Sequence, residues 1–429
     1  MLERVLFGRN HDITKRAYAW NLCASLMYSV QSAILLLVIT RIGGVIEAGI
    51  FTILYTVTQT LASLGSYSMR NFQASDVNGE YEFKTYYSSR LATCICMLIA
   101  CIGYGIIRGL NSERFFILML LSLYRVSDGM EDVFHGEAQK KGRLDVASVA
   151  MTFRIGFSVV GFCLMYWFSR SLLLASIVLV AVSFAVFVFT NIEIIKHFDS
   201  ITPKLTRTGV FRLLMVTFPV FFGAILYNYL VNVPKYAIDR FLGDEEQTIF
   251  NILFMPIFVV NILSMFIFKP MVKQMGEWWN KGEHKAFAKA VVIQWSLISI
   301  ITLTVAVGGY FLGCPVLGLI YGVDLSEYSF LFARLLCYGG IAALATFLSV
   351  VLTIMRKQGF VILGYVAGYI TSLIMTERLV PRREINGAGD LYGCIMGMVL
   401  AVFLIVVCLV FAGKKGVRDN DRTVEADLS

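Results

Sequence analysis

The chain alternates between long apolar stretches and short polar connections over almost its whole length. Most of the apolar stretches approach or exceed the roughly 20 residues that a helix needs to cross the hydrocarbon core of a bilayer. There are twelve of them: Ala17–Thr40, Ile46–Met69, Leu91–Ile107, Phe115–Met130, Ala147–Phe168, Leu172–Ile192, Phe211–Val233, Ile249–Phe268, Ala290–Leu312, Phe330–Met355, Phe360–Met375 and Leu391–Ala412. They are continuously apolar, whereas a membrane β-barrel has strands of about ten residues with alternating polarity. The pattern predicts an all-α polytopic membrane protein with about 12 transmembrane helices.

One sequence pattern occurs twice in the chain, 199 residues apart. The segment Arg41–Leu54 recurs as Arg240–Leu253, and seven of the fourteen positions are identical, among them an arginine, a glycine and a glutamate. Each copy joins the end of one apolar stretch to the start of the next, so we infer an internal duplication. Chance similarity between two apolar segments is the alternative. Under the duplication, we expect the repeated arginine and glutamate of each copy to form matching ion pairs.

The duplication divides the apolar stretches equally. Six lie in each half, and Pro203 and Lys204 interrupt the pattern between the sixth and the seventh. An even number of spans gives both halves the same orientation, which predicts two six-helix bundles related by a parallel pseudo-two-fold axis. The expected domains are residues 1–203, residues 204–412 and a cytoplasmic tail of residues 413–429.

Composition and charge agree with a membrane protein. Charged residues make up 15% of the chain, against about 25% in soluble domains. Of the 37 lysines and arginines, 25 lie in segments that are cytoplasmic if both termini are inside, and nine lie on the outer side. This asymmetry predicts the orientation, and attraction to anionic inner-leaflet lipids accounts for the net charge of +8. The basic residues are dispersed rather than clustered, which argues against a nucleic-acid partner.

The sequence offers little for metal or cofactor chemistry. Its nine cysteines fall mostly within apolar stretches, and none of them has a metal-ligand or thioredoxin-like spacing. It also lacks a nucleophile elbow and a phosphate-binding glycine loop. We therefore expect no metal site, no cofactor and no enzymatic activity, and leave H⁺ and Na⁺ open as coupling ions.

The fourth apolar stretch carries the richest set of charges. Four residues follow one another at intervals of three, four and three, and so share one stripe of a helix: Arg125, Asp128, Asp132 and His135. The next stretch supplies Arg154. An unpaired arginine inside a bilayer costs at least about 2.5–3.5 kcal/mol, so these arginines must face protein or water. We hypothesise that Arg125 and Arg154 bind an anionic head group in a cavity open to the cytoplasm, while Asp128 and Asp132 orient them or bind a coupling ion.

A purely structural role is the alternative for each of these residues. Arg125 and Asp128 are three residues apart and can neutralise each other within the helix. His135 is expected to be a solvated loop residue. Arg334, five residues into the tenth stretch, is a further candidate for substrate binding, but it is close enough to the membrane surface to extend outward.

A second polar group lies at the outer end of the seventh stretch. It combines three tyrosines with Asn228, Asn232, Lys235 and Asp239. Asn228 and Asn232 are one helical turn apart and can bind sugar hydroxyls, Lys235 can bind an anion, and Asp239 is a candidate for ion coupling. The alternative is a belt of aromatic residues at the membrane surface.

Two segments resemble a known family. The stretches Tyr124-Arg125-x-x-Asp128-Gly129-x-x-Asp132-x-x-x-Gly136-x-x-Gln139-Lys140 and Asn232-x-Pro234-Lys235-Tyr236-Ala237-Ile238 are similar to those of bacterial Wzx-type polysaccharide flippases. These flippases belong to the multidrug/oligosaccharidyl-lipid/polysaccharide flippase superfamily, and the likeness extends over essentially the whole chain.

The resemblance implies a function. It implies export of a polyprenyl-pyrophosphate-linked oligosaccharide across the bacterial cytoplasmic membrane by alternating access, for surface polysaccharide biosynthesis. Membrane lipids and polysaccharide assembly enzymes are then the expected partners, and both termini are expected in the cytoplasm. A cationic cavity between the bundles, typical of such proteins, suits Arg125, Arg154 and Arg334. The basic group Arg378, Arg382 and Arg383 on the expected outer side departs from the family pattern.

Two other functions remain open from the sequence. A small-molecule exporter of the multidrug branch has a similar fold, but acidic residues would be expected to dominate its cavity. A membrane polymerase or ligase acting on polyprenyl-linked sugars usually has a sizeable outer loop. No outer segment here exceeds about seventeen residues, too few for an independent core.

Overall fold

The computed structural model describes residues 6–7, 13–76, 79–198, 201, 203–268, 271–357 and 359–427. The predicted tail, residues 413–429, lies outside the residues whose side chains are described. The chain separates into two compact units, Met1–Tyr229 and Leu230–Ser429, and the division falls within one long helix. The domain boundary expected after residue 203 lies in the connection before that helix and stays a prediction.

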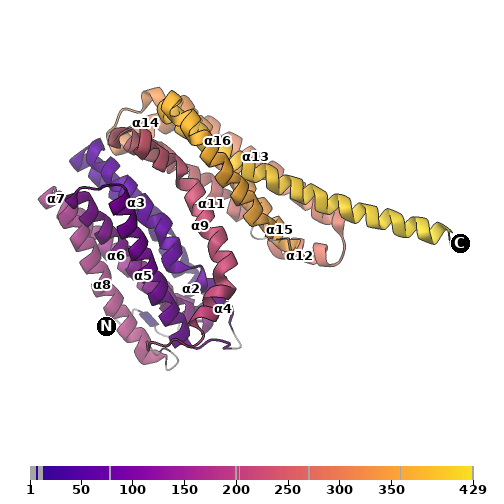
Figure 1. The fold of residues 1–429 in the computed structure, drawn as a ribbon, viewed down its shortest axis with the longest axis horizontal. Coiled ribbons are helices and arrows are strands. Elements are labelled where there is room, and N and C mark those ends of the chain that lie inside the picture. The colour runs from indigo at the N-terminus through magenta and orange to yellow at the C-terminus, as the bar shows by residue number, and fades with distance from the viewer. Residues whose placement is uncertain are drawn as a thin grey trace. The chain divides into compact units, whose positions relative to one another are not determined.

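The N-terminal unit is a bundle of long helices (Figure 1). Its helices are α2 (Ile13–Gly43), α3 (Val45–Ser66), α4 (Met69–Ser75), α5 (Phe83–Ile107), α6 (Ser112–Lys140), α7 (Leu144–Ser169), α8 (Leu172–His197) and the first part of α9 (Val210–Phe241). The start of α9 belongs to this unit because Phe221 stacks on Tyr67, with ring centroids 4.1 Å apart.

The C-terminal unit consists of the end of α9 and the helices that follow it. These are α10 (Asp244–Phe254), α11 (Ile257–Phe268), α12 (Val272–Asn280), α13 (His284–Gly308), α14 (Cys314–Tyr321), α15 (Ser329–Ile354) and α16 (Gly359–Asp427), with a π-helical turn at Gly309–Gly313 and a 3-10 turn at Ser326–Tyr328. Helix α16 contains Pro381 and is kinked at Glu384, which has a positive φ of 52°. The missing N–H of a proline interior to a helix explains such a break.

The structure confirms the predicted all-α polytopic fold. Within the described residues, ten helices are long and apolar enough to cross a membrane. Eleven of the twelve predicted spans fall in them, because both of the last two lie in α16. The remaining predicted span lies in α6, which contains too many charged residues to be counted among these ten apolar helices. The relation of the halves by a pseudo-two-fold axis stays a prediction.

The repeated sequence pattern lies at a connection between two helices in both units. In each copy a long helix ends and the next begins immediately after a glycine, Gly44 before α3 and Gly243 before α10. Gly44 has a φ of 87°, a conformation that residues with a Cβ rarely adopt. The duplicated glycine therefore marks a duplicated tight turn between helices.

The prediction of an ion pair between Arg240 and Glu246, in the second copy of the repeat, is wrong. Arg240 pairs with Glu377, at 3.0 Å, and not with Glu246. Glu246 instead accepts a hydrogen bond from the backbone N–H of Gly243, and so caps the start of α10. In the first copy, Glu47 accepts a hydrogen bond from the Tyr166 hydroxyl at 2.8 Å. The glutamate thus lies after the turn in both copies, but its hydrogen-bond partner differs between them.

Helices α9 and α5 extend beyond the apolar stretches that predict them, and both extensions concern the candidate site. Helix α9 continues through Pro234 to Phe241, so the residues expected in an outer connection are helical. Helix α5 begins at Phe83 rather than at Leu91, which places Arg90 inside the bundle with no exposed surface. The outer faces of the helices carry large exposed apolar side chains such as Phe168 and Ile106, as expected for surfaces in contact with lipid.

Close helix packing in the C-terminal unit gives a test of the fold. A Cβ added to Gly340 of α15 would overlap the side chain of Thr302 on α13. We expect Gly340→Ala to lower the free energy of unfolding by about 1–3 kcal/mol, because the overlap forces the helices apart. Thermal unfolding in detergent would measure the change.

Gly397→Ala is the matched control for this substitution. Gly397 also lies within a helix, α16, but nothing lies within 4 Å of where its Cβ would be. There alanine should leave stability unchanged or raise it by up to about 1 kcal/mol, since glycine is the poorer helix former. Equal effects of the two changes would contradict the packing described for α13 and α15.

Candidate functional site

Helix α6 is the centre of the candidate site. It packs against α3, α4, α5, α7 and α8, so its charged residues contact protein rather than lipid. The side chain of Asn111 caps its start by accepting a hydrogen bond from the backbone N–H of Arg114, at 2.9 Å. The helix continues to Lys140, ten residues beyond the predicted end of the apolar stretch. The whole predicted stripe of charges therefore lies within the bundle.

Arg154 of α7 joins three helices through one guanidinium group. Its Nε donates to Glu131 Oε2 at 2.6 Å, and its Nη2 donates to Asp128 Oδ1. Its Nη1 donates to the hydroxyls of Ser127 on α6 and Ser183 on α8, at 3.3 and 3.0 Å. The side chain is 1% exposed. All three guanidinium nitrogens are hydrogen-bonded, so Arg154 is held firmly in place.

Arg125 is equally buried but less fully hydrogen-bonded. Its Nη1 donates to Asp128 Oδ2 at 2.8 Å, and its guanidinium carbon lies 4.5 Å from the centre of the Tyr55 ring. Within the described part of the chain, its Nε and Nη2 atoms have no hydrogen-bond partner. The expected pairing with Asp128 therefore exists, yet it leaves two donors of Arg125 for another acceptor. Buried donors without partners are costly and call for an explanation.

Asp132 is held by two arginines that the sequence analysis did not select. Arg90 Nη2 donates to Asp132 Oδ2 at 2.9 Å, and Arg70 Nη1 donates to Oδ1 at 3.3 Å. Arg90 also donates to the carbonyl oxygen of Gly65, near the end of α3, at 3.0 Å. Both arginines had been counted only as basic residues of a cytoplasmic connection. The early start of α5 is the physical reason that Arg90 is inside.

The expectation of a solvated His135 is wrong. The side chain is 2% exposed, and its Nε2 lies 3.6 Å from Glu131 Oε1. Glu131 is also 2% exposed. Because α6 continues for ten residues beyond Met130 within the bundle, both residues are covered by neighbouring helices. Among the described residues, Glu131 Oε1 and His135 Nε2 each lack a hydrogen-bond partner.

These residues line a cavity of about 380 Å³ in the N-terminal unit, which we call the arginine cavity. Its lining consists of Tyr28, Gln59, Ala62, Ser63, Ser66, Arg70, Arg125, Asp128, Gly129, Glu131, Asp132, His135, Met151, Arg154 and Asn228. Three arginines and three carboxylates balance in formal charge. The carboxylates of Asp128 and Asp132 each accept from two arginines. Among the described residues, the buried side-chain atoms of this lining without a hydrogen-bond partner are Arg125 Nε and Nη2, Glu131 Oε1 and His135 Nε2.

The polar group expected at the end of α9 is divided between the units. Asn228 lines the arginine cavity and donates to the Ser63 hydroxyl at 2.7 Å. Asn232 and Lys235 belong to the C-terminal unit and are each 9% exposed, and Asp239 is partly buried there. The Lys235 ammonium lies 5.3 Å from the centre of the Phe254 ring. Asn228 is thus the member of this group that lies in the N-terminal unit and lines the arginine cavity.

Arg334 forms a second charged cluster in the C-terminal unit. Its Nη1 donates to Asp390 Oδ1 at 2.7 Å and its Nη2 to Asn386 Oδ1 at 2.7 Å. Arg383, one of the three arginines that depart from the family pattern, donates to Asp390 Oδ2 at 2.8 Å. The Tyr338 hydroxyl donates to Asp390 at 3.1 Å. Arg334 thus fixes the kinked region of α16 against α15 and does not simply extend outward.

Asp390→Asn tests this cluster. The change keeps the shape of the side chain but removes the charge that two arginines share, so we expect the free energy of unfolding to fall by about 1–2 kcal/mol. Arg383→Gln removes a partner that is 61% exposed and should cost less than about 1 kcal/mol. Thermal unfolding in detergent compares them. A larger effect of Arg383→Gln would show that Asp390 is not the centre of the cluster.

Within the described residues, no group of three or more histidine, cysteine, aspartate or glutamate side chains is placed to hold a metal ion. The nine cysteines are free thiols.

Comparison with known proteins identifies the fold. No protein-family model matches the chain. An inward-facing multidrug resistance transporter of the MATE family, in the MOP superfamily, has the same fold, with a TM-score of 0.67 and 12% identity over 91% of this chain and 95% of that one. A MOP superfamily transporter from Pyrococcus furiosus, whose reversed pocket polarity suggests a different function, gives a TM-score of 0.54 and 13% identity over 94% and 95%. The chain is a multi-pass membrane protein with the MOP transporter fold.

A curated protein gives a more particular likeness. The chain is 22% identical over 317 residues to the capsular polysaccharide biosynthesis protein CapF of Staphylococcus aureus, covering 71% of this chain and 76% of that protein. The resemblance to flippases of the MOP superfamily, inferred from the sequence, agrees with both comparisons.

Proposed function

We propose that this protein is a flippase that moves a polyprenyl-pyrophosphate-linked oligosaccharide across the bacterial cytoplasmic membrane by alternating access. The observation that carries the proposal is the buried guanidinium of Arg125, which lines the arginine cavity with two unpaired donors. Pyrophosphate supplies acceptor oxygens, and the planar guanidinium can bind two of them at once. The similarity to a capsular polysaccharide biosynthesis protein supports a lipid-linked sugar as the substrate.

In this proposal the other charged residues of the cavity hold Arg125 in position to bind the pyrophosphate. Asp128 lies between Arg125 and Arg154, and Arg154 is fixed by contacts with α6 and α8. Asp132 forms an ion pair with Arg70 and so fixes its position. Asp128 and Asp132 thus orient arginines, and their coupling to H⁺ or Na⁺, like that of Asp239, stays a prediction.

A place for the lipid tail is also present in the N-terminal unit. A mostly apolar groove of about 600 Å³ is lined by α5, by the connection to α9 and by the start of α9. Leu91, Ile95, Phe211 and Leu214 provide much of its surface, and Arg207 is its charged residue. Thr206 anchors the connection by donating its backbone N–H to the Ser88 hydroxyl at 2.8 Å. The tail of a lipid-linked sugar can lie in such a groove while the head group is in a polar cavity.

Export of a small molecule is the second candidate function. The MATE fold favours it, and so does the buried Glu131 Oε1, which has no hydrogen-bond partner among the described residues and could accept from a cationic drug. Against it, the other two carboxylates of the cavity are occupied by arginines.

Depletion of the protein from cells separates these functions. Protected vesicles from depleted cells would be treated with a membrane-impermeant lectin or glycosidase to locate lipid-linked oligosaccharides. The flippase proposal predicts that they accumulate on the cytoplasmic leaflet. Normal arrival at the outer leaflet without polymerisation would favour a polymerase or ligase, and unchanged lipid-linked sugars would favour small-molecule export.

A further inference from the structure

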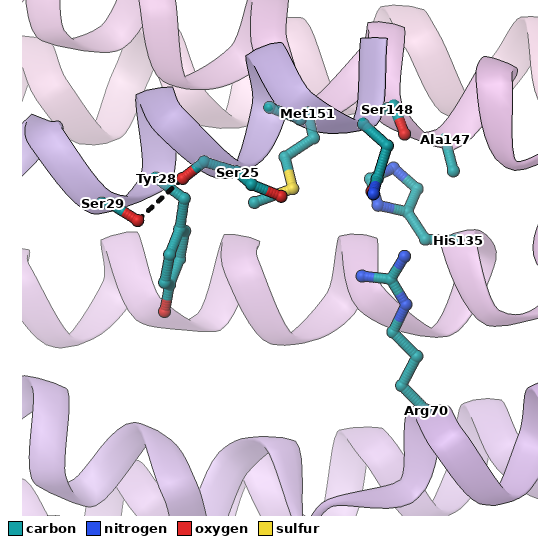
Figure 2. Close-up of a pocket in the computed structure, with 10 residues that line it drawn as sticks. Ser25, Tyr28, Ser29, Arg70, His135, Ala147, Ser148 and Met151 are labelled. Carbon is teal, nitrogen blue, oxygen red and sulfur yellow. Dashed lines mark hydrogen bonds between the residues drawn. The ribbon is translucent and has the colours of Figure 1, made fainter. Parts of the chain in front are cut away.

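A second cavity of about 200 Å³ lies within the N-terminal unit (Figure 2). We call it the hydroxyl cavity because side-chain hydroxyls and amides are prominent in its lining: Asn21, Ala24, Ser25, Tyr28, Ser29, Arg70, His135, Ala147, Ser148 and Met151. Figure 2 shows Arg70 and His135 reaching toward this space from different elements than Tyr28 and Ser29. Residues of α2, α4, α6 and α7 thus meet around one polar space.

The two cavities adjoin each other. They share Tyr28, Arg70, His135 and Met151 as lining residues. Arg70 is the charged link, because it also pairs with Asp132 of the arginine cavity. The hydroxyl cavity therefore lies beside the cavity in which an anionic group would bind.

The hydroxyl cavity contains a buried group that requires a partner. His135 is 2% exposed, and its Nε2, which lies 3.6 Å from Glu131 Oε1 of the arginine cavity, has no hydrogen-bond partner among the described residues. Buried polar atoms are rarely left unsatisfied, so a ligand or water is expected beside it. Ser25 and Ser29 lie nearby on the exposed face of α2. These groups can both donate and accept hydrogen bonds, as is needed to bind a sugar hydroxyl.

The volume of the hydroxyl cavity limits the ligand to a small group. About 200 Å³ corresponds to roughly seven water molecules at about 30 Å³ each, which is comparable to one hexose ring. The sugar unit nearest the pyrophosphate is the part of the substrate that matches this volume.

We propose that the hydroxyl cavity is the subsite for the first sugar of the lipid-linked substrate, with His135, Ser25 and Ser29 recognising its hydroxyls. This inference rests on the flippase function, since the adjoining arginine cavity holds the pyrophosphate in that account. It assigns sugar recognition to the N-terminal unit, and to α2 and α6 in particular.

Binding to the purified full-length protein tests the subsite. The two probes are undecaprenyl pyrophosphate and the same lipid carrying a single hexose. The wild-type protein should bind the glycosylated lipid at least about fivefold more tightly, as one or two additional neutral hydrogen bonds allow. Equal affinity for the two probes would overturn the subsite and leave the flippase proposal standing. If neither probe binds, the flippase proposal fails and the subsite fails with it.

A matched pair of variants locates the effect. Ser29→Leu places an apolar side chain at the edge of the hydroxyl cavity, and Ser296→Leu makes the same change on α13. Both serines are exposed and donate to the backbone carbonyl four residues earlier, Ser29 to Ser25 and Ser296 to Val292. Ser29→Leu should remove the preference for the glycosylated lipid but leave binding of undecaprenyl pyrophosphate unchanged, and Ser296→Leu should change neither. An intact preference in folded Ser29→Leu protein would overturn the subsite.

Discussion

Replacing Arg125 with glutamine is expected to reduce transport of the lipid-linked oligosaccharide by about 100-fold or more, while the protein still inserts and folds. Two or more charge-assisted hydrogen bonds to the pyrophosphate would be lost, each worth about 1.5–3 kcal/mol. Folding should survive because Asp128 keeps its bond to Arg154. The measurement is the amount of oligosaccharide that reaches the outer leaflet in cells that contain only the variant.

Arg114→Gln is the control for this prediction. It makes the same change on the same helix, but Arg114 lies in the first turn of α6 and does not line the arginine cavity. Transport by this variant should be within about twofold of wild type, because substitutions away from special features usually change energies by no more than about 0.5 kcal/mol. Normal transport by Arg125→Gln would contradict the role of Arg125, whatever the control shows.

The second large effect is expected on stability, at Arg154. Replacing it with methionine leaves the buried carboxylate of Glu131 without its arginine and removes one of the two arginines from Asp128. Breaking a buried ion pair from one side costs about 3–5 kcal/mol. We therefore expect Arg154→Met to unfold at a much lower temperature in detergent, or to fail to accumulate in the membrane.

A compensating change distinguishes this mechanism from simple loss of packing. Glu131→Gln added to Arg154→Met removes the uncompensated buried charge, so the double variant should recover at least half of the lost stability. Transport should remain defective in it, because Asp128 and Arg125 lose the support of Arg154. If the double variant is no more stable than Arg154→Met alone, the ion pair between Arg154 and Glu131 is not what holds α6 and α7 together.

Much of the fold was predictable because it depends on local sequence. Apolar stretches of membrane-spanning length predicted the helices, and both copies of the repeated pattern lie where one helix ends and the next begins, at Gly44 and Gly243. Errors occurred where polar residues lie inside the bundle. The apolar pattern stopped at Met130, although α6 continues to Lys140, and a composition-based boundary cannot distinguish a buried charge from a solvated one.

The candidate site was predictable in its central helix but not in its partners. The stripe from Arg125 to His135 is visible in the sequence because helical periodicity aligns it. Arg90 meets Asp132 from 42 positions away, and Arg334 meets Asp390 from 56. Such pairs depend on which helices are neighbours and at what depth. The burial of His135 could not be predicted for the same reason, because it depends on which other helices cover it.

Transport by the purified protein in liposomes tests the central claim most directly. Undecaprenyl-pyrophosphate-linked oligosaccharide would be placed in the inner leaflet, and its appearance in the outer leaflet would be followed with an impermeant lectin. The account predicts rapid appearance with wild-type protein, and appearance no faster than in protein-free liposomes with Arg125→Gln. Equal rates for wild-type protein and protein-free liposomes, with the protein correctly folded, would contradict it.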